Sequence, residues 1–327
     1  MTRSCEVSVI IPAYNSAATL AQAVQSVMEQ DLQDFELLII DDGSTDPTAD
    51  VARQFSNDPR VVFVPVPENK GKPHAMNLGV RMAHGRWIAV LDADDWYAPA
   101  RLSTLVATGD RANAQLVADN QFVYDEGASQ VVRTALPATT GHKRLDKPEF
   151  VAGCDPYAEF DLGMLKPMIR TEFVRKTNLQ YRENARLSED FLYLLEFFAA
   201  GGEGCLISRP LYYWRQAYGT LSRHWTTSGH GAWRYDFLSG ARASEDVLEA
   251  LHQRDERQLA KMLERRIRAF HRLHQLQEVS RKRADGASLK EVAASVAMRP
   301  SIWPIIAQRL LRRFSAARDH ESLSGAH

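Results

Sequence analysis

The stretch Trp87-Ile88-Ala89-Val90-Leu91-Asp92-Ala93-Asp94-Asp95 places a cluster of carboxylates directly after an apolar run. The apolar run predicts a buried β-strand, and an open parallel sheet presents ligand-binding residues at the carboxyl ends of its strands. Carboxylate oxygens there can hold Mg²⁺ or Mn²⁺, which in turn can hold a diphosphate. An isolated Asp-x-Asp turn is also typical of helix caps and Asx-turns, so this turn alone leaves both interpretations open.

A second acidic strand end lies upstream. The segment Phe35-Glu36-Leu37-Leu38-Ile39-Ile40 is followed by Asp41-Asp42-Gly43-Ser44. Because the carboxyl ends of parallel strands meet at one edge of a sheet, the two acidic ends are expected to lie at the same edge. Two such ends in one sheet are hard to explain as helix caps, and they favour a ligand site.

The composition is that of an ordinary globular enzyme. At 327 residues, 45% hydrophobic and 25% charged, the chain is long enough for one large domain and an appendage. A formal net charge of -1 predicts no general attraction to nucleic acid or to a membrane. Cys5, Cys154 and Cys205 are far apart and form no Cys-x-x-Cys pair, which indicates neither a disulfide framework nor a zinc site. We therefore expect a protein of the reducing cytosol.

The sequence offers no candidate for a signal peptide or a membrane span. The first apolar run, residues 7–11, is too short for a signal peptide and ends at Pro12. No stretch reaches the roughly 20 apolar residues that a spanning helix needs. Any contact with a membrane is therefore expected to be peripheral.

Short β-branched runs alternate with helical patterns through about residue 110, which predicts an α/β fold with a mostly parallel sheet flanked by helices. Residues 125–159 are expected to be loops over one face of the site, and residues 164–170 a strand. From about residue 231 onward, the spacing of the apolar residues predicts helices alone. We expect a main domain over residues 1–225, divided into the parts 1–120 and 121–225, and a helical C-terminal region over residues 226–327.

Four motifs in order carry a family resemblance. They are Ser8-Val9-Ile10-Ile11-Pro12-Ala13-Tyr14-Asn15, Glu36-Leu37-Leu38-Ile39-Ile40-Asp41-Asp42-Gly43-Ser44-Thr45-Asp46, Asn69-Lys70-Gly71 and Leu91-Asp92-Ala93-Asp94-Asp95. This series resembles family 2 of the inverting glycosyltransferases with the GT-A fold, over residues 7 to about 100 and, less tightly, to about residue 225. Two later segments, residues 164–170 and 186–190, resemble the bacterial exopolysaccharide subgroup, including succinoglycan-type glucosyltransferases.

The resemblance implies that residues 1–120 are a nucleotide-sugar-binding part, with UDP-glucose as the expected UDP-sugar donor, and that residues 121–225 are an acceptor part. The implied nucleotide contacts are Pro12, Ala13, Tyr14, Asp41, Asp42 and Ala93. Asp42 is expected to accept a hydrogen bond from N3–H of uracil, for which a carboxylate is a suitable acceptor. The alternative for Asp41 or Asp42 is a cap on the helix expected to start at Pro47.

Further implied contacts reach the diphosphate, the sugar and the cation. Lys70 and Lys72 flank Gly71, where an ammonium can meet the diphosphate; a solvated lysine pair is the alternative. Asn77 is expected to face the sugar. Alternation along an extended segment lets Asp92 and Asp94 converge on one Mg²⁺ or Mn²⁺ while Ala93 turns away. Asp94 is the expected direct ligand, Asp92 contacts the ribose or the metal through water, and Asp95 is left to cap the helix near Pro99.

Asp190, in Ser188-Glu189-Asp190, matches the Glu-Asp pair that the family has at the start of a helix. The resemblance therefore implies Asp190 as the general base, the carboxylate that takes the proton of the acceptor hydroxyl during inversion. Glu189 is the second choice. The alternative is an ordinary helix N-terminus with Ser188 as its cap. The Gln-x-x-Arg-Trp motif of many processive relatives is absent from the sequence, which favours transfer of one sugar per acceptor. Arg215, Arg223 and His224 lie in a segment that could close over the diphosphate.

The C-terminal residues 299–314 combine an apolar face bearing Trp303 with clustered arginines, as interfacial helices do. A saccharide acceptor carried on undecaprenyl diphosphate would be presented at the inner leaflet, so peripheral docking on the inner face of the plasma membrane is one expectation. Packing on the protein or a dimer contact is the alternative. The absence of Gly-x-Gly-x-x-Gly after the first strand argues against a Rossmann-type dehydrogenase, whereas a catalytically inactive nucleotide-sugar-binding scaffold is the alternative function.

Overall fold

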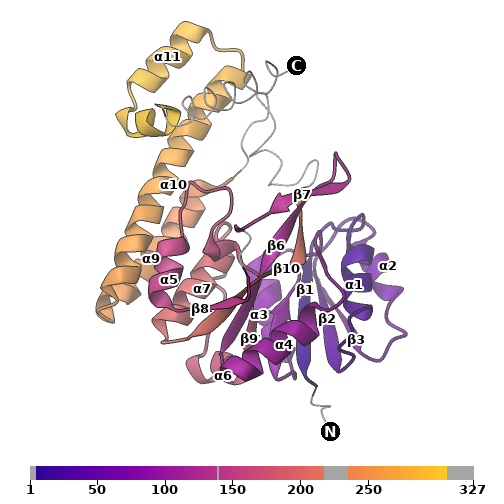
Figure 1. The fold of residues 1–327 in the computed structure, drawn as a ribbon. Helices are drawn as coiled ribbons and strands as arrows, with labels where there is room; N and C mark the ends of the chain where they lie inside the picture. The colour runs from indigo at the N-terminus through magenta and orange to yellow at the C-terminus, as the bar shows by residue number, and fades with distance from the viewer. Residues whose placement is uncertain (1–4, 138–139, 217–234, 308–327) are drawn as a thin grey trace, which may run out of the picture.

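The computed structural model describes residues 5–137, 140–216 and 235–307 (Figure 1). Within them ten strands form one sheet, in the order β3-β2-β1-β4-β9-β6-β10-β5, with β7 paired to β6 and β8 paired to β10. The strands are β1 (Val7–Ala13), β2 (Phe35–Asp42), β3 (Val61–Val66), β4 (Trp87–Val90), β5 (Trp96–Tyr97), β6 (Leu116–Asp125), β7 (Gln130–Thr134), β8 (His142–Leu145), β9 (Met168–Arg170) and β10 (Gly204–Gln216). The helices of the first 200 residues are α1 (Leu20–Met28), α2 (Thr48–Arg53), α3 (Lys72–Met82), α4 (Arg101–Ala112), α5 (Lys147–Gly153), η1 (Leu162–Met164), α6 (Thr171–Thr177) and α7 (Glu189–Ala199).

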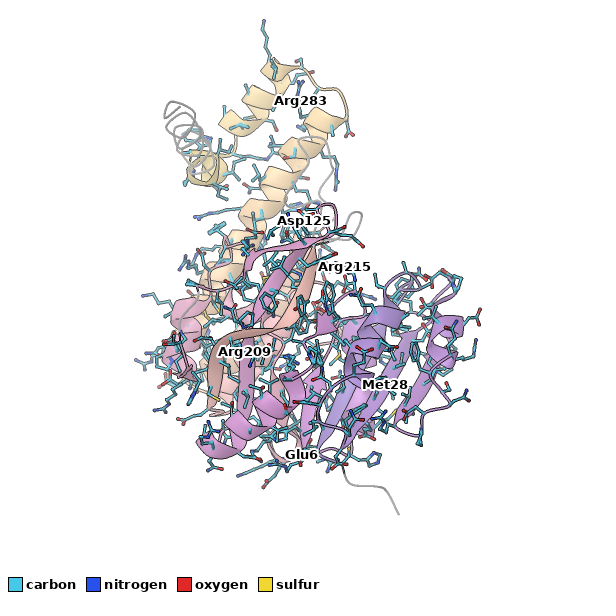
Figure 2. The ribbon with its side chains drawn as sticks, turned by 45° about the vertical axis from the view of Figure 1, so that its right-hand side comes forward. Glu6, Met28, Asp125, Arg209, Arg215 and Arg283 are labelled. Carbon is cyan, nitrogen blue, oxygen red and sulfur yellow. The ribbon has the colours of Figure 1, made fainter. Side chains whose placement is uncertain are left out.

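Strands β1 to β4 form the parallel part of the sheet that the sequence predicted. β1 lies between β2 and β4 and is parallel to both, so the segment after β1 lies between the two acidic strand ends. The short strand β9 then enters antiparallel to both β4 and β6. Figure 2 shows Glu6, just before β1, at one end of the sheet, and Asp125 and Arg215, at the ends of β6 and β10, at the other. The carboxyl ends of the parallel strands thus share one edge.

The two faces of the sheet are buried by different helices. Val9 and Ile11 of β1 pack in one core cluster with residues of α1 and α4. Ile10, between them, points the other way and packs in the second cluster with residues of α3 and α7. This alternation is the period of two that a strand imposes. Because both faces are covered, the central strands read as continuous apolar runs.

The C-terminal helices are α9 (Phe237–Gln253), α10 (Arg257–Ala284), α11 (Leu289–Ala297) and η2 (Pro300–Ile302). The predicted apolar face of α10, from Leu259 to Leu276, is buried, and it belongs to the same core cluster as α7. Figure 1 shows α10 running alongside α5 and α9 and extending beyond the sheet toward α11. None of the helices in the described part of the chain is long and apolar enough to cross a bilayer.

The region after residue 125 differs from the prediction. Residues 125–159 are not only loops, since they contain β7, β8 and α5. The predicted strand 164–170 is shorter, with η1 before it and only β9 extended. β10 was not predicted, because Ser208, Arg209 and Pro210 interrupt its apolar pattern. The pairing of β10 with β6 shifts register on both sides of Pro210, as expected for a residue that cannot donate to a ladder.

Candidate functional site

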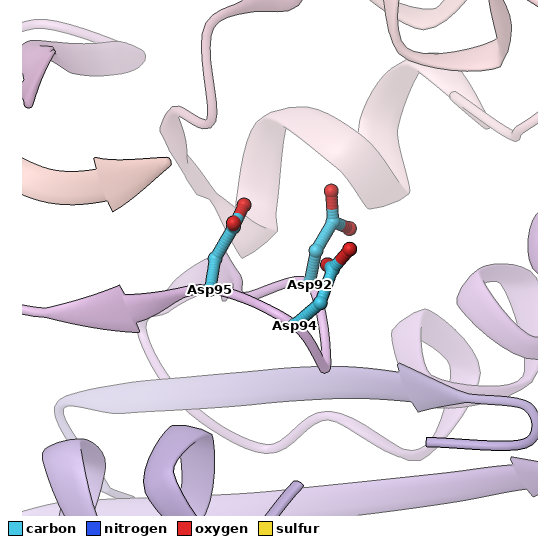
Figure 3. Close-up of side chains that lie close together, drawn as sticks. All are labelled: Asp92, Asp94 and Asp95. Atoms are coloured by element: carbon cyan, nitrogen blue, oxygen red, sulfur yellow. The ribbon is translucent and has the colours of Figure 1, made fainter. Parts of the chain in front are cut away.

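The three aspartates of the turn after β4 lie together at the carboxyl edge of the sheet. The turn is closed by a hydrogen bond from the Asp95 amide to the Asp92 carbonyl, 3.1 Å. Asp92, Asp94 and Asp95 each offer one carboxylate oxygen within 4.8 Å of the others. Figure 3 shows all three carboxylates pointing to the same side of the turn. The sequence predicted the convergence of Asp92 and Asp94 but not the participation of Asp95.

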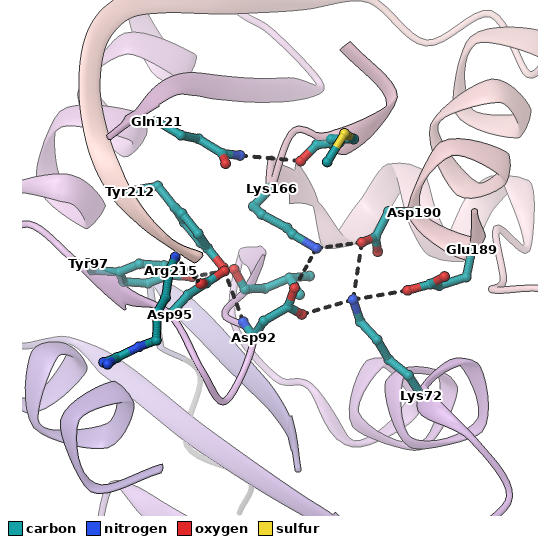
Figure 4. Close-up of polar contacts among 12 residues, drawn as sticks. Lys72, Asp92, Asp95, Tyr97, Gln121, Lys166, Glu189, Asp190, Tyr212 and Arg215 are labelled. Carbon is teal, nitrogen blue, oxygen red and sulfur yellow. Dashed lines mark hydrogen bonds and ion pairs between the residues drawn. The ribbon is translucent and has the colours of Figure 1, made fainter. Parts of the chain in front are cut away.

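Two lysines join Asp92 to the carboxylates of α7 (Figure 4). Nζ of Lys72 lies 2.9 Å from Oδ1 of Asp92, 3.1 Å from Oδ2 of Asp190 and 3.1 Å from Oε1 of Glu189. Nζ of Lys166 lies 2.7 Å from Oδ2 of Asp92 and also pairs with Asp190. The structure thus brings Lys72, Asp92, Glu189 and Asp190 together, as one site would require, and adds Lys166 to them.

These ion pairs control the charge of the carboxylates. Burial alone would raise the pKa of Asp190, but the nearby ammonium groups of Lys166 and Lys72 outweigh it and hold that pKa below its usual value. The same opposition lowers the pKa of Asp92 far below its usual range. Burial lowers the pKa of the Lys72 ammonium, but Asp190, Asp92 and Glu189 raise it well above its usual value. At neutral pH both lysines of the network, Asp92 and Asp190 are therefore charged.

Lys166 was not predicted as a site residue, although the segment 164–170 that contains it carried the resemblance to the exopolysaccharide subgroup. It lies between η1 and β9, and β9 is inserted between β4 and β6. This insertion carries the lysine to the end of β4. The neighbouring Pro167 and the apolar residues around Lys166 gave no periodic signal that separates a site lysine from a surface one.

The Asp95 side chain forms its hydrogen bonds with β10 and does not cap a helix. The prediction that it caps the helix near Pro99 is therefore wrong. Its carboxylate accepts hydrogen bonds from the Tyr212 hydroxyl, 2.7 Å, and from the Arg215 amide, 2.8 Å. Helix α4 begins at Arg101 without a side-chain cap. Burial and the charges of Asp94 and Asp92 raise the pKa of Asp95 well above its usual value.

The turn fits a divalent cation. Within the described residues, the Asp94 side chain forms no hydrogen bond or ion pair with another residue, and burial together with the charge of Asp92 raises its pKa. Oδ1 of Asp92 is buried beside the Lys72 ammonium, at 2.9 Å. Hard carboxylate oxygens held this close together repel one another, and a cation would relieve that repulsion. Asp94, with Asp92 beside it, is the part of the turn that could hold it.

The other acidic strand end supports the loop that carries Lys72. Asp42 is buried and accepts hydrogen bonds from the amides of Lys70, 3.0 Å, and Gly71, 2.6 Å. Gly71 has φ 97°, a conformation that favours glycine, and its amide approaches the carboxylate closely. The Asp42 carboxylate and the Lys72 ammonium thus connect the ends of β2 and β4 through one turn.

The alternative of a helix cap does not hold for Asp41 or Asp42. Asp41 accepts from the Ser44 amide, 3.1 Å, within its own turn. Asp46 instead accepts from the amide of Thr48, the first residue of α2, 3.0 Å. The expected role of both residues toward a nucleotide stays a prediction.

The remaining predicted nucleotide and diphosphate contacts lie at or near the same edge. Pro12 and Ala13 are buried at the end of β1, whereas Tyr14 is 47% exposed. Ala93 is buried in the core, as alternation predicted. The Lys70 ammonium is at the surface, 3.6 Å from Glu68, and does not join the network of Lys72.

Asn77 does not face the site, in contrast to the prediction. Its side chain is buried in α3, donates to the Tyr181 carbonyl, 2.9 Å, and accepts from the Tyr181 amide, 2.8 Å. It also donates to Glu183, 3.2 Å. Because both the NH₂ group and the carbonyl oxygen of this amide already form hydrogen bonds within the protein, little hydrogen-bonding capacity remains for a sugar.

The start of α7 is not an ordinary capped N-terminus. Ser188 precedes the helix with φ 71° and makes no side-chain cap. Its hydroxyl instead accepts a hydrogen bond from Nε of Arg266, 3.2 Å, a residue of α10. Arg266 was not predicted as a site residue. Arg266 lies three residues after the buried Leu263 and four before the buried Phe270. This helical spacing was the available signal that Arg266 lies on the buried face of α10.

Arg215 is buried beside the acidic turn. Its guanidinium donates to the Asp94 carbonyl, 2.7 Å, and pairs with Glu126, 2.9 Å. Arg215 thus lies against the acidic turn, whereas the sequence placed it in a segment that could close over the diphosphate. Arg223 and His224 lie outside the described residues, as do residues 308–314 of the predicted interfacial helix. Trp303 of that segment is 51% exposed, and its indole donates to the Val296 carbonyl, 2.9 Å.

Comparison with known proteins identifies relatives along nearly the whole chain. Residues 8–165 match the model of glycosyl transferase family 2. The succinoglycan biosynthesis protein ExoO of Rhizobium meliloti (strain 1021) is 30% identical over 332 residues, which cover 98% of this chain and 90% of that protein. ExoU of the same organism is 32% identical and covers 78% of this chain and 75% of its own length.

Solved structures share the architecture. S. aureus TarS in complex with UDP-GlcNAc superposes with a TM-score of 0.62 at 19% identity, over 80% of this chain and 72% of that one. The mannosyltransferase PcManGT of Pyrobaculum calidifontis, in complex with GDP-Man and Mn²⁺, gives a TM-score of 0.52 at 18% identity, over 100% of this chain and 89% of that one. At these identities the similarity supports the fold.

Proposed function

Because the chain belongs to glycosyl transferase family 2 and has the predicted GT-A fold, we propose that it moves one sugar from a UDP-sugar to a saccharide acceptor with inversion. The similarity to ExoO and ExoU supports a place in bacterial exopolysaccharide synthesis, with UDP-glucose as the first donor to test. The acceptor is a saccharide, free or linked to undecaprenyl diphosphate.

One observation carries this proposal: the carboxylate of Asp190 lies against the acidic turn, joined to Asp92 by Lys72 and Lys166. In an inverting transfer, the acceptor hydroxyl loses its proton as it attacks the anomeric carbon, and UDP leaves on the opposite side. A low pKa keeps Asp190 deprotonated and ready to accept that proton. The proposed base therefore adjoins the turn proposed to hold the donor.

The other residues have supporting roles in this proposal. Lys72 and Lys166 carry positive charge to where the diphosphate of the donor would lie, and both are preorganised by their carboxylate partners. Asp94, with Asp92, would hold Mg²⁺ or Mn²⁺, which as a Lewis acid stabilises the negative charge on departing UDP. Pro12, Ala13, Tyr14, Asp41 and Asp42 would line the nucleotide, and Glu189 would orient the acceptor or Lys72.

The location of the protein also remains a proposal. We expect it in the cytoplasm, with peripheral contact to the inner face of the plasma membrane through residues 299–314. The expected boundaries, a main domain over 1–225 and a helical region over 226–327, are retained as hypotheses for dissecting the chain.

A non-catalytic nucleotide-sugar-binding scaffold is the second candidate. It is favoured by the fact that Asp92 and Asp190 are already neutralised by lysines, an arrangement that binding alone would also tolerate. Such a scaffold would bind UDP but release none from a UDP-sugar in the presence of any acceptor.

Thermal-shift titration with UDP, with and without Mn²⁺, followed by a UDP-release assay over a panel of UDP-sugars and saccharide acceptors, tests the proposal. We expect stabilisation by UDP that requires Mn²⁺, and release that requires both substrates. Stabilisation independent of metal would contradict the role of Asp94. Binding without release from any donor would favour the scaffold.

A further inference from the structure

A cavity of about 320 Å³ opens beside the proposed base. One end is lined by Lys72, Asp92, Lys166 and Asp190, which form the network described above. The other end reaches α10, which contributes Arg266, Phe270 and Leu273. The volume lies at the lower end of the roughly 300–1,000 Å³ typical of small-molecule sites. The cavity thus connects the candidate chemistry to the C-terminal helices.

Helix α10 is fixed to the segment that carries the base. Nη1 of Arg266 pairs with the buried Asp161 at 2.9 Å, and its Nε donates to Ser188. The guanidinium carbon also lies 3.8 Å from the centre of the Phe191 ring, one residue after Asp190. A charged group with three such partners holds its helix in one position. The part of the cavity wall that α10 supplies is therefore held in a fixed position relative to Asp190.

The lining has two chemical characters. Phe160, Trp214, Phe270 and Leu273 supply apolar surface. Gln121, Glu159 and Gln216 supply hydrogen-bonding groups at other points of the lining. A pyranose ring matches this division, since its C–H groups form an apolar face and its hydroxyls project from the edge. Gln216 donates to Glu159 at 3.1 Å and Gln121 donates to the Met164 carbonyl at 3.3 Å, so these polar groups are held in place within the lining. Sugar hydroxyls can form hydrogen bonds to this polar side, whereas an isoprenoid chain has no group that can.

We propose that this cavity binds the terminal saccharide of the acceptor, one or two pyranose rings, and that α10 helps to select it. The inference rests on the proposed transfer function and identifies where its second substrate binds. A hydroxyl of that saccharide forms the new bond to the anomeric carbon of the donor, the bond from that carbon to UDP breaks, and the proton passes to Asp190. The C-terminal helices are then part of the substrate site.

Saturation-transfer difference NMR with cellobiose, laminaribiose and lactose tests the assignment on the full chain. We expect a signal on ring protons with the wild-type protein. Met164→Trp, which adds bulk in the cavity lining, and Trp214→Ala, which removes apolar surface, should each lose that signal. Leu276→Ala is the control, because Leu276 is a buried residue of α10 that does not line the cavity. It should keep the signal.

Thermal shift by UDP with Mn²⁺, measured on every variant, separates the possible failures. If the variants and the wild type bind UDP but the disaccharide signal is absent, or survives both substitutions, the cavity assignment is overturned while the transfer function stands. If the wild type does not respond to UDP, the proposed function itself fails. Farnesyl phosphate serves as a competing probe. Its binding in place of the disaccharides would assign the cavity to the lipid part of a carrier and overturn the saccharide assignment.

Discussion

Nζ of Lys166 lies 2.7 Å from Oδ2 of Asp92, and this contact ties the segment before β9 to the acidic turn after β4. The same ammonium pairs with Asp190, so one lysine contacts both the turn proposed to hold a cation and the carboxylate proposed as base. The charge of Asp190 therefore depends on residues contributed by distant parts of the chain.

Replacing Lys166 should change the pH dependence of transfer. Lys166 lowers the pKa of Asp190, so Lys166→Met should raise that pKa. Because a base acts only when deprotonated, activity falls as pH drops through its pKa, and the acidic limb of the kcat profile should move to higher pH. The measurement is kcat against pH at saturating substrates.

Two controls define the result for Lys166. Lys166→Arg keeps the positive charge and should leave the acidic limb close to that of the wild type. Lys147→Met removes a half-buried lysine that pairs with Glu256 at 2.7 Å, away from the site, and should not move the limb. If the acidic limb of Lys166→Met stays at the same pH as in the wild type, a group other than Asp190 determines that limb.

Asp94→Asn should stabilise the metal-free protein and abolish its response to metal. Burial and the neighbouring Asp92 raise the pKa of Asp94 in the folded state, so its negative charge opposes folding at neutral pH. The amide removes that charge but is a poorer ligand for a hard cation. We expect a higher midpoint of thermal unfolding without metal, and no further rise with Mn²⁺ and UDP.

The exposed Asp34 provides the comparison, and Asp34→Asn should change neither quantity. A variant at Asp94 that keeps the full Mn²⁺-dependent shift would remove this residue from the metal site.

Strands β1 to β4 were predictable because each is a mostly apolar run that ends at a turn. The acidic turn and Lys72 could be selected from the sequence because they lie at element ends, and Asp190 could be selected because the donor-site motifs accompany it. Lys166 could not, because its position depends on β9 pairing antiparallel with strands far away in the sequence. Local patterns carry no information about such an insertion.

Asn77 and Asp95 show a different limit. Both were assigned from their neighbours in the sequence, one to the sugar and one to a helix cap. In the fold, each side chain forms hydrogen bonds with a segment more than 100 residues away. Asn77 is bonded to the Tyr181 backbone, and Asp95 to Tyr212 and Arg215. A buried polar group must find a partner, and tertiary structure decides which one it finds.

The buried ion pair of Arg101 and Asp119 should be essential to stability. The two side chains are 0% and 1% exposed and lie 2.7 Å apart, and Asp119 also accepts from the Leu211 amide of β10. Asp119→Ala leaves the guanidinium buried without its counter-charge, which costs about 3–5 kcal/mol of unfolding free energy. Urea denaturation measures this loss.

A surface pair gives the scale for that comparison. Asp110 pairs with Arg86 at 2.6 Å but is 42% exposed, so Asp110→Ala should cost no more than about 1 kcal/mol. Similar losses in the two variants would mean that the Arg101–Asp119 pair is better hydrated than its burial indicates.

Asp190→Asn should remove transfer while leaving binding of UDP intact. The amide keeps the shape of the side chain but cannot accept the proton of the acceptor hydroxyl, a contribution worth roughly 10²–10⁴-fold in rate. We expect kcat to fall by that factor in a UDP-release assay, with the Mn²⁺-dependent thermal shift by UDP unchanged. Glu189→Gln is the matched control, because Glu189 contacts the same Lys72 ammonium at the same distance of 3.1 Å. If Glu189→Gln shows the large loss and Asp190→Asn the small one, the base is Glu189, and the lysine pair serves to hold Asp190 as a structural counter-charge.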